Sequence, residues 1–241
     1  MMNPITKDGE GMNLPQVLKK ISEMLTTPEG EVVLAEAGLV AGAVSPPIGV
    51  VAESLSVFLQ QFDKFKLRML LRGLSKDLNV EKHLNALYSY VSSSSTRAFT
   101  VGNVFRETVA AKSPKICMLY GLILAKHIGE QNSDFTIDDI IVCNALENAG
   151  DYDLDNFKEL MELWINQEGI IEYPKEEKDK LEKTCLWCVY SRLFSIHGYT
   201  WAILAGEDDP ESKTVKTNYI VDNSAKTLLN LISELGQIWN Y

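Results

Sequence analysis

Residues 32–59 form the most apolar stretch of the chain, with Glu36 and Glu53 as its only charged side chains and Pro46 and Pro47 near its middle. A helix that spans a bilayer needs about 20 apolar residues. The uncharged run between the two glutamates is shorter, and each proline removes a backbone donor and clashes one turn back. The pattern therefore predicts two short helical arms joined at the prolines.

We interpret these arms as a hairpin that is buried in the protein core. Their many Ala, Gly and Val residues let two helices approach closely. The residues expected to form the hairpin contacts are Leu39, Val40, Val44, Pro46, Pro47, Ile48 and Val51. Conditional contact with a membrane, made by a membrane-perturbing effector, stays open as an alternative for the same segment.

A basic amphipathic helix is predicted directly after this hairpin. Its positive side chains recur every four residues and therefore share one face: Lys64, Arg68, Arg72 and Lys76. An apolar stripe runs beside them, formed by Phe58, Phe62, Phe65 and Met69. Such a face is typical of a solvated surface or a contact for an acidic protein partner, and anionic lipid is the alternative.

Charge is distributed unevenly along the 241 residues, a length that fits one large or two small domains. Residues 1–130 contain 14 Lys and Arg against 12 Asp and Glu, whereas residues 131–241 contain 9 against 21. An acidic surface repels phosphate, which argues against general nucleic-acid binding. The basic middle and the acidic end can attract each other within one chain or between two copies.

The periodicity of apolar residues predicts a mainly helical protein with two domains. The first, residues 1–129, is an N-terminal helical bundle that holds the apolar hairpin. Its later helices are expected over residues 80–91, 99–111 and 114–128, with a serine loop at residues 92–95. The second, residues 130–241, is an acidic α+β domain. Its expected helices cover residues 136–149, 155–166, 175–196 and 225–235, and a two-stranded hairpin covers residues 199–204 and 215–221.

The order of elements in residues 130–241 resembles a winged-helix domain: three helices, a hairpin and a closing helix. The stretch from Tyr219 to Ile232 is similar to the wing strand and following helix of that fold. This resemblance implies a DNA-binding regulator as one function. The expected recognition helix, however, mixes Lys and Arg with an almost equal number of Asp and Glu, so a protein-binding role is favoured over DNA.

The layout of the whole chain resembles bacterial abortive-infection proteins of the alpha type. The stretch from Leu84 to Lys115 carries most of the likeness, including residues 103–111 and the Lys-Ser-Pro run that follows them. The resemblance implies a role in defence against phage. It supplies no catalytic residue.

Two side-chain patterns could hold a metal. Asp151, Asp153, Asp155 and Glu162 match several acidic positions of a calcium loop, but Asn156 replaces the turn glycine. We therefore expect these acids to lie at a helix start, with Asp155 as its cap. Cys185 and Cys188 with His197 suggest a zinc site, but a structural zinc site needs four ligands and usually a second close pair, which the sequence lacks, so it predicts two core cysteines.

No nucleophile elbow and no glycine-rich phosphate loop occurs in the sequence. We therefore expect a non-enzymatic protein without cofactor or metal, which binds another macromolecule and can form homo-oligomers. The four cysteines and the lack of a basic leader before the apolar run predict a cytoplasmic protein, with the inner-membrane surface as the alternative location.

Overall fold

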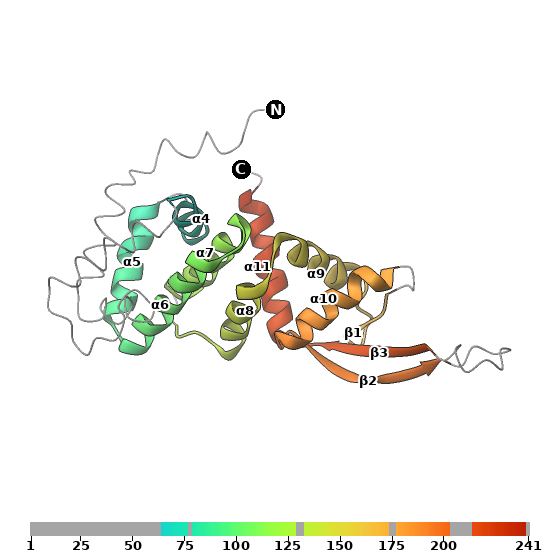
Figure 1. The fold of residues 1–241 in the computed structure, drawn as a ribbon. Helices are drawn as coiled ribbons and strands as arrows, with labels where there is room; N and C mark the ends of the chain where they lie inside the picture. Colours follow the sequence, from blue (N-terminus) through green and yellow to red (C-terminus); the bar gives the residue numbers. More distant parts are fainter. Residues whose placement is uncertain (1–63, 77–78, 129–132, 174–176, 203–213, 240–241) are drawn as a thin grey trace, which may run out of the picture. The chain divides into compact units, whose positions relative to one another are not determined.

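The computed structural model describes residues 64–76, 79–128, 133–173, 177–202 and 214–239. These residues form a mainly helical protein with one small antiparallel sheet (Figure 1). They divide into two compact units. Unit 1 contains the described residues up to Thr136 together with those from Ser233 onward, and unit 2 runs from Ile137 to Ile232. The predicted apolar hairpin of residues 32–59 lies outside the described residues.

Unit 1 is helical throughout its described part. Its elements are α4 (Lys64–Leu74), α5 (Val80–Ser92), α6 (Ser95–Ala110), α7 (Pro114–Ile128) and the last residues of α11 (Asn223–Trp239). The predicted helix over residues 114–128 is confirmed at both ends. Its start follows from Ser113, whose Oγ accepts the backbone N–H of Ile116 at 3.3 Å and caps the helix ahead of Pro114.

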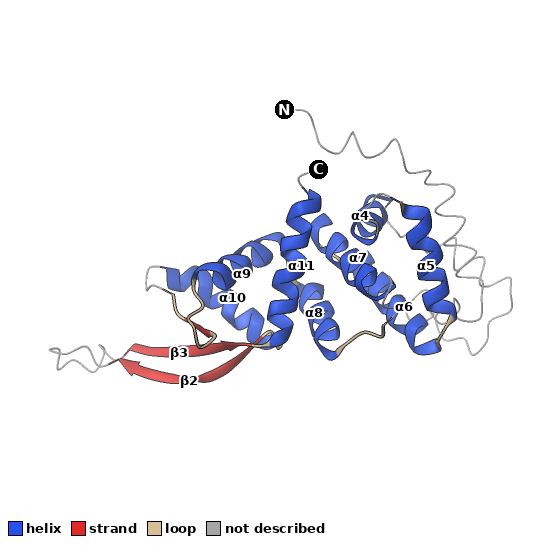
Figure 2. Cartoon of the chain, turned by 180° about the vertical axis from the view of Figure 1, so that it is seen from behind, coloured by secondary structure: helices blue, strands red, loops and turns tan. Residues whose placement is uncertain are grey.

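α7 is the central helix of unit 1, because its residues 116–124 are all buried. None of these nine residues is charged, so this part of the helix has no charged face to turn toward water. It packs against α4, α5 and α6, and Figures 1 and 2 both show α4 crossing it. Burying each large aliphatic side chain contributes roughly 1.5–3 kcal/mol before the entropy cost of ordering it.

The crossing of α4 and α7 depends on two glycines. A Cβ atom on Gly73 would overlap the backbone carbonyl oxygen of Met118, and one on Gly121 would overlap that of Leu70. The two backbones therefore approach more closely than any side chain permits. This close contact fixes the angle and the register of the two helices that form the core of unit 1.

Unit 2 combines helices with the sheet. Its elements are α8 (Ile137–Asn148), α9 (Asp151–Leu163), β1 (Ile170–Ile171), α10 (Lys178–Tyr190), β2 (Phe194–Ala202), β3 (Thr214–Val221) and the first part of α11. β3 is the central strand, and the sheet order is β1-β3-β2 with both pairs antiparallel. Figure 2 shows β2 and β3 as a long hairpin beside α10.

The core of unit 2 forms around Phe157 of α9. Its ring stacks on Phe194 of β2 and meets Trp187 of α10 edge-on, with centroids 6.1 Å apart in each pair. These contacts join the second helix, the third helix and the start of the sheet. Other buried side chains of unit 2 are Leu160, Leu181, Cys185, Tyr219 and Leu228.

Three expectations for unit 2 need correction. The predicted two-stranded hairpin is present as β2 and β3 but belongs to a three-stranded sheet. The segment 168–173, where the sequence allows a short strand or a turn, supplies β1, because Ile170 and Ile171 pair with Ile220 and Tyr219 of β3. α9 begins at Asp151, and Asp155 therefore lies inside the helix and is not its cap. The cap contact is made by Asp153, whose Oδ2 accepts the N–H of Gly150 at 2.8 Å.

The third correction concerns α10, which was expected to extend to residue 196 but ends at Tyr190. Arg192 has a φ of 61°, in the left-handed region. The N–H groups of Leu193 and Arg192 return to the carbonyls of Cys188 and Val189 at 2.7 and 3.0 Å. This is a Schellman end, which usually has glycine at the position of Arg192, so the sequence lacks the ordinary stop signal.

Candidate functional site

The predicted basic face on α4 contacts the end of α11 within unit 1. Lys76 Nζ lies 2.5 Å from the Glu234 carboxylate. Arg72 donates to the carbonyl oxygen of Ile238 at 3.0 Å, where a positive charge is favoured by the helix dipole. Arg68 is exposed, and the side chain of Lys64 is outside the described part of the structure. Two of the four predicted residues thus bind this chain itself.

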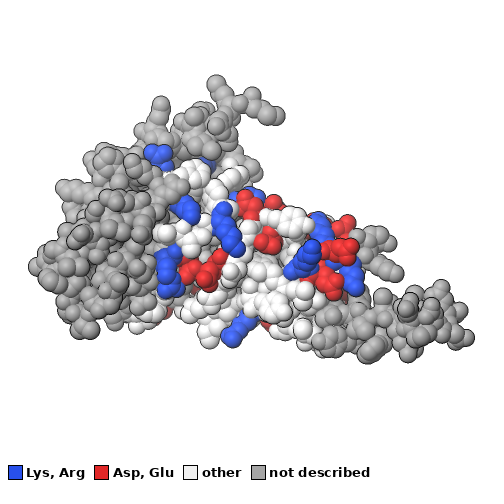
Figure 3. All heavy atoms as spheres, in the orientation of Figure 1, with Lys and Arg blue, Asp and Glu red and all other residues white. Residues whose placement is uncertain are grey.

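Lysines and acids alternate over α9 and α10. Lys180 Nζ lies 2.5 Å from Glu159, and Lys178 lies 3.9 Å from Glu182. The hydrogen bond with Glu159 raises the pKa of Lys180. On the face shown in Figure 3, blue and red side chains lie next to one another, without a continuous basic patch among the coloured residues. Phosphate binding would have to compete with these acids.

None of the helices in the described ranges is both long and apolar enough to cross a membrane. The candidate membrane or core residues, from Leu39 to Val51, lie outside these ranges. The membrane-perturbing alternative depends on them and remains a sequence-based expectation.

Cys185 and Cys188 lie on α10 with both thiols buried, whereas His197 lies on β2 with its side chain exposed. Burial, with a smaller effect from Glu182, raises the pKa of Cys185 to about 12. Burial also raises the pKa of Cys188 well above its ordinary value. Both sulfurs are therefore thiols at neutral pH, whereas metal binding and nucleophilic attack need thiolates. Within the described residues, no cluster of three His, Cys, Asp or Glu side chains could hold a metal.

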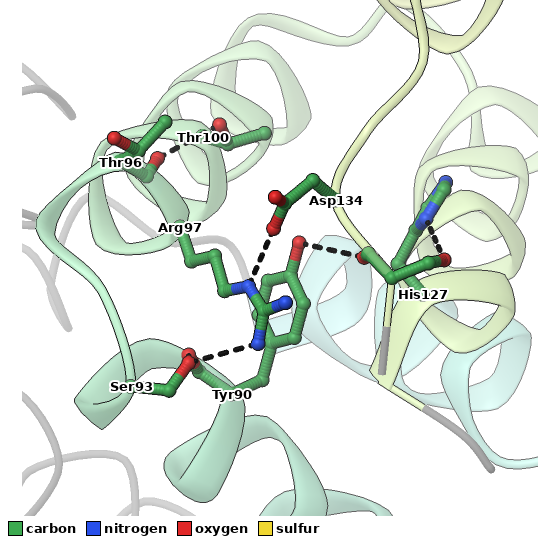
Figure 4. A network of polar contacts seen from close by, with 8 residues as sticks. Tyr90, Ser93, Thr96, Arg97, Thr100, His127 and Asp134 are labelled. Carbon is green, nitrogen blue, oxygen red and sulfur yellow. Dashed lines mark hydrogen bonds and ion pairs between the residues drawn. The ribbon is translucent and has the colours of Figure 1, made fainter. Parts of the chain in front are cut away.

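A polar network ties residues 133–135 to the helices of unit 1 (Figure 4). Arg97 lies over the Tyr90 ring, 4.6 Å from its centroid, and binds Asp134 at 2.6 Å. The Tyr90 hydroxyl donates to the carbonyl of Ser133 at 3.2 Å. Buried His127 lies 3.0 Å from Ser133 Oγ. A catalytic Ser–His pair would use a carboxylate to orient the histidine, but Asp134 binds Arg97. The contacts instead hold Ser133 and Asp134 against the helices, and we call this network the clamp around Arg97.

A groove in unit 2 is the strongest candidate for a binding site. It encloses about 630 Å³ between α8 and the end of α10. The α8 wall is one face of that helix, with residues spaced three, four and seven apart: Ile137, Ile140, Ile141, Asn144, Glu147 and Asn148. The opposite face of α8 packs into the core through Val142, Ala145 and Leu146. Apolar side chains therefore lie on both faces of this helix.

Two isoleucines of α8 leave large apolar side chains exposed to water at the groove. Ile137 is 77% exposed and Ile140 is 49% exposed. Isolated exposed apolar residues are ordinary, but these two border one hollow with a shared aromatic wall. That wall is formed by α10, where Trp187 lines the groove and Tyr190 is 84% exposed.

The polar end of the groove is formed by Ser191 and Arg192. The left-handed backbone at Arg192 costs roughly 1 kcal/mol relative to glycine. Ser224 Oγ donates to the Arg192 carbonyl at 3.1 Å and helps to hold that conformation. A long charged residue at a position that favours glycine is consistent with a functional contact of Arg192.

The groove was not predicted from the sequence. A signal was present, because Ile137, Ile140 and Ile141 recur at helical spacing on the face opposite Val142 and Leu146. That pattern is ordinary for a helix buried on all sides. Only the structure places one of the two faces at an open groove.

Comparisons with models of known protein families, with curated proteins and with solved structures found no match. The chemistry of the groove, of the clamp around Arg97 and of the basic residues on α4 is therefore the basis for a function.

Proposed function

We propose that this protein acts by binding another protein through the groove between α8 and α10, without catalysing a reaction. The observation that carries the proposal is the second apolar face of α8. Water contact at Ile137 and Ile140 costs free energy, which a partner recovers by covering them. Tyr190 adds a large aromatic surface, and aromatic residues are enriched among those that dominate binding energy.

A DNA-binding regulator is the second candidate. The direct succession of α10 and the β2–β3 hairpin supports it, since this order resembles a winged helix. The charge on α10 disfavours it. Lys178 and Lys180 each lie beside a glutamate, and a recognition helix would have to exchange those contacts for phosphates.

We place the binding activity in defence against phage, on the resemblance of residues 84–115 to abortive-infection proteins. The test is plating efficiency on a bacterial host that expresses the full chain. Tyr190→Ser should abolish protection at unchanged protein level. Tyr152→Ser is the matched control, because Tyr152 is 63% exposed in the same unit but does not line the groove. Protection that survives Tyr190→Ser would count against this role for the groove.

The binding proposal is tested by photocrosslinking from single positions of the full chain in cells. A photoreactive phenylalanine at position 190 should give a discrete protein adduct, and the same residue at position 152 should not. Adding Ile140→Gln should remove the adduct, because it takes away apolar contact without adding charge. If positions 190 and 152 behave alike, the groove is not the binding site.

A further inference from the structure

We infer that the groove between α8 and α10 receives a basic amphipathic helix of the partner protein. This inference rests on the proposed function and adds the chemistry of the partner. It follows from the shape of the groove, the charge of the helices around it and the positions of two helix ends.

The shape of the α8 wall suits a helix. Its apolar and polar lining residues follow one stripe from Ile137 to Asn148, the full length of α8. Such a stripe is about 18 Å long at 1.5 Å per residue, which matches three turns of a partner helix. Helix-in-groove recognition uses apolar anchors spaced at three, four and seven residues. The three isoleucines on one side and Trp187 with Tyr190 on the other provide apolar walls for such anchors.

Glu147 and Arg192 are the two charged residues of the lining and balance one another. The net charge of the unit that holds the groove nevertheless favours a positive partner. The chain from Ile137 to Phe157, which forms α8 and the first half of α9, contains six Asp and Glu and no Lys or Arg. Unit 2 as a whole contains 19 acidic and nine basic residues, a net charge of −10. A second copy of this unit would meet the first with like charge, and anionic lipid and nucleic acid would be repelled for the same reason.

The C-terminal ends of α8 and α10 also lie at the groove and affect which charge it favours. Glu147 and Asn148 at the end of α8 line the groove, as do Tyr190 and Ser191 at the end of α10. The C-terminus of a helix carries about half a negative charge, so the end of α8 favours a cation of the partner, whereas the end of α10 already has Arg192 beside it. Arg192 is the single Lys or Arg in the lining, at the α10 end. We therefore expect the partner's basic residues along Glu147 and an acceptor opposite Arg192.

The inference is tested with labelled peptides of about 14 residues, long enough for three helical turns with frayed ends. One is an amphipathic Leu/Lys helix, the second replaces every Lys by Glu, and the third scrambles the Leu/Lys order. Fluorescence anisotropy with the full chain should show saturable binding of the first peptide. Its Kd should be at least about tenfold lower than that of either other peptide, a difference of about 1.4 kcal/mol.

Variants locate the binding. Ile140→Gln should weaken the Leu/Lys peptide about tenfold, as expected for loss of a buried aliphatic anchor. The matched control is Leu163→Gln, because Leu163 is 65% exposed at the end of α9 and is not part of the groove. Circular dichroism and the melting temperature of both variants should equal those of the parent, since both side chains are exposed.

The outcomes separate the inference from the proposed function. Equal binding of the scrambled peptide, equal or tighter binding of the Leu/Glu peptide, or no effect of Ile140→Gln would overturn the basic-helix inference. A crosslink from position 190 to a second copy of this chain would overturn it as well. A position-specific crosslink to another protein would still leave the proposed function standing, whereas its absence would remove the proposed function itself.

Discussion

Gly73 and Gly121 meet where α4 crosses α7, and a Cβ atom on Gly121 would lie 3.0 Å from the backbone carbonyl carbon of Gly73. Both positions face backbone, which cannot rotate away as a side chain can. The crossing therefore tolerates no side chain at either of these two positions.

Gly73→Ala and Gly121→Ala should each lower the free energy of unfolding by more than about 2 kcal/mol, because the added methyl group forces the helices apart and opens the core around α7. Chemical denaturation monitored by circular dichroism measures this. Gly236→Ala on α11 is the control with the opposite sign. Among the described residues outside its own helix turn, no atom lies within 4 Å of the added Cβ, so the variant should gain about 0.5–1 kcal/mol from helix propensity. Stable Gly73→Ala and Gly121→Ala proteins would refute the close crossing.

Arg192→Gly should stabilise the protein by roughly 1 kcal/mol and raise its melting temperature by several degrees, because glycine adopts a φ of 61° without a steric penalty. Ser191→Gly is the neighbouring control. Ser191 has a φ of −85°, so glycine there relieves no strain and should not stabilise. A lower melting temperature for Arg192→Gly would mean that the arginine side chain contributes more than its backbone costs.

The buried thiols on α10 predict a loss of stability in alkali. The pKa of Cys185 is about 12 in the folded protein and about 9 when unfolded, because burial disfavours the thiolate. Between these values the unfolded chain binds fewer protons than the folded one, so the free energy of unfolding falls as pH rises above 9. The raised pKa values of Cys188 and of half-buried Tyr173 act in the same direction.

Melting curves from pH 8 to 11 measure this effect. The double variant Cys185→Ala with Cys188→Ala should be less stable at pH 8, because it leaves cavities. It should nevertheless lose less stability on going to pH 11. An aromatic disulfide reagent offers a second readout. Half-buried Cys143 should react first, and the two α10 thiols only on unfolding. Parallel pH curves for parent and variant would contradict the assignment.

The ion pair of Lys76 with Glu234 is about half exposed on both sides and should contribute less than about 1 kcal/mol. Lys76→Glu and Glu234→Lys should each lower the melting temperature, and the double variant should recover it, because the exchange restores opposite charges. The differences should shrink between 0.05 and about 0.5 M salt as the charges are screened. An equal loss of melting temperature at all salt concentrations would indicate that the single variants disturb packing and not a charge interaction.

Removing a single hydrogen-bonding group from the clamp around Arg97 should lower the stability of the protein. Tyr90→Phe removes the hydroxyl that donates to the Ser133 carbonyl and should cost about 1 kcal/mol, since Tyr90 is buried. Thr96→Val on the neighbouring exposed helix surface should have little effect. Hydrogen exchange of the amides of residues 133–135 should increase in Tyr90→Phe and stay unchanged in Thr96→Val.

Local signals in the sequence determined much of the helical pattern. Ser113 and Pro114 mark the start of α7, and the uninterrupted apolar run marks it as the buried helix of unit 1. The alternation of residues near β3 also predicts a strand there. These features depend on contacts between residues close in the chain, and such contacts repeat with the period of the helix or strand.

Tertiary structure decided where α10 ends, which strand joins the hairpin and which face of α8 stays open. The turn at Arg192 is held by Ser224, 32 residues away, and β1 is a strand only because β3 lies beside it. Gly73 and Gly121 are likewise required only because α4 crosses α7, and neither local sequence predicts that crossing. From the amino-acid sequence alone, the isoleucines of α8 are equally suited to a core and to a binding groove. The reason is that an apolar side chain can be covered by its own chain or by a partner, and the sequence does not distinguish the two.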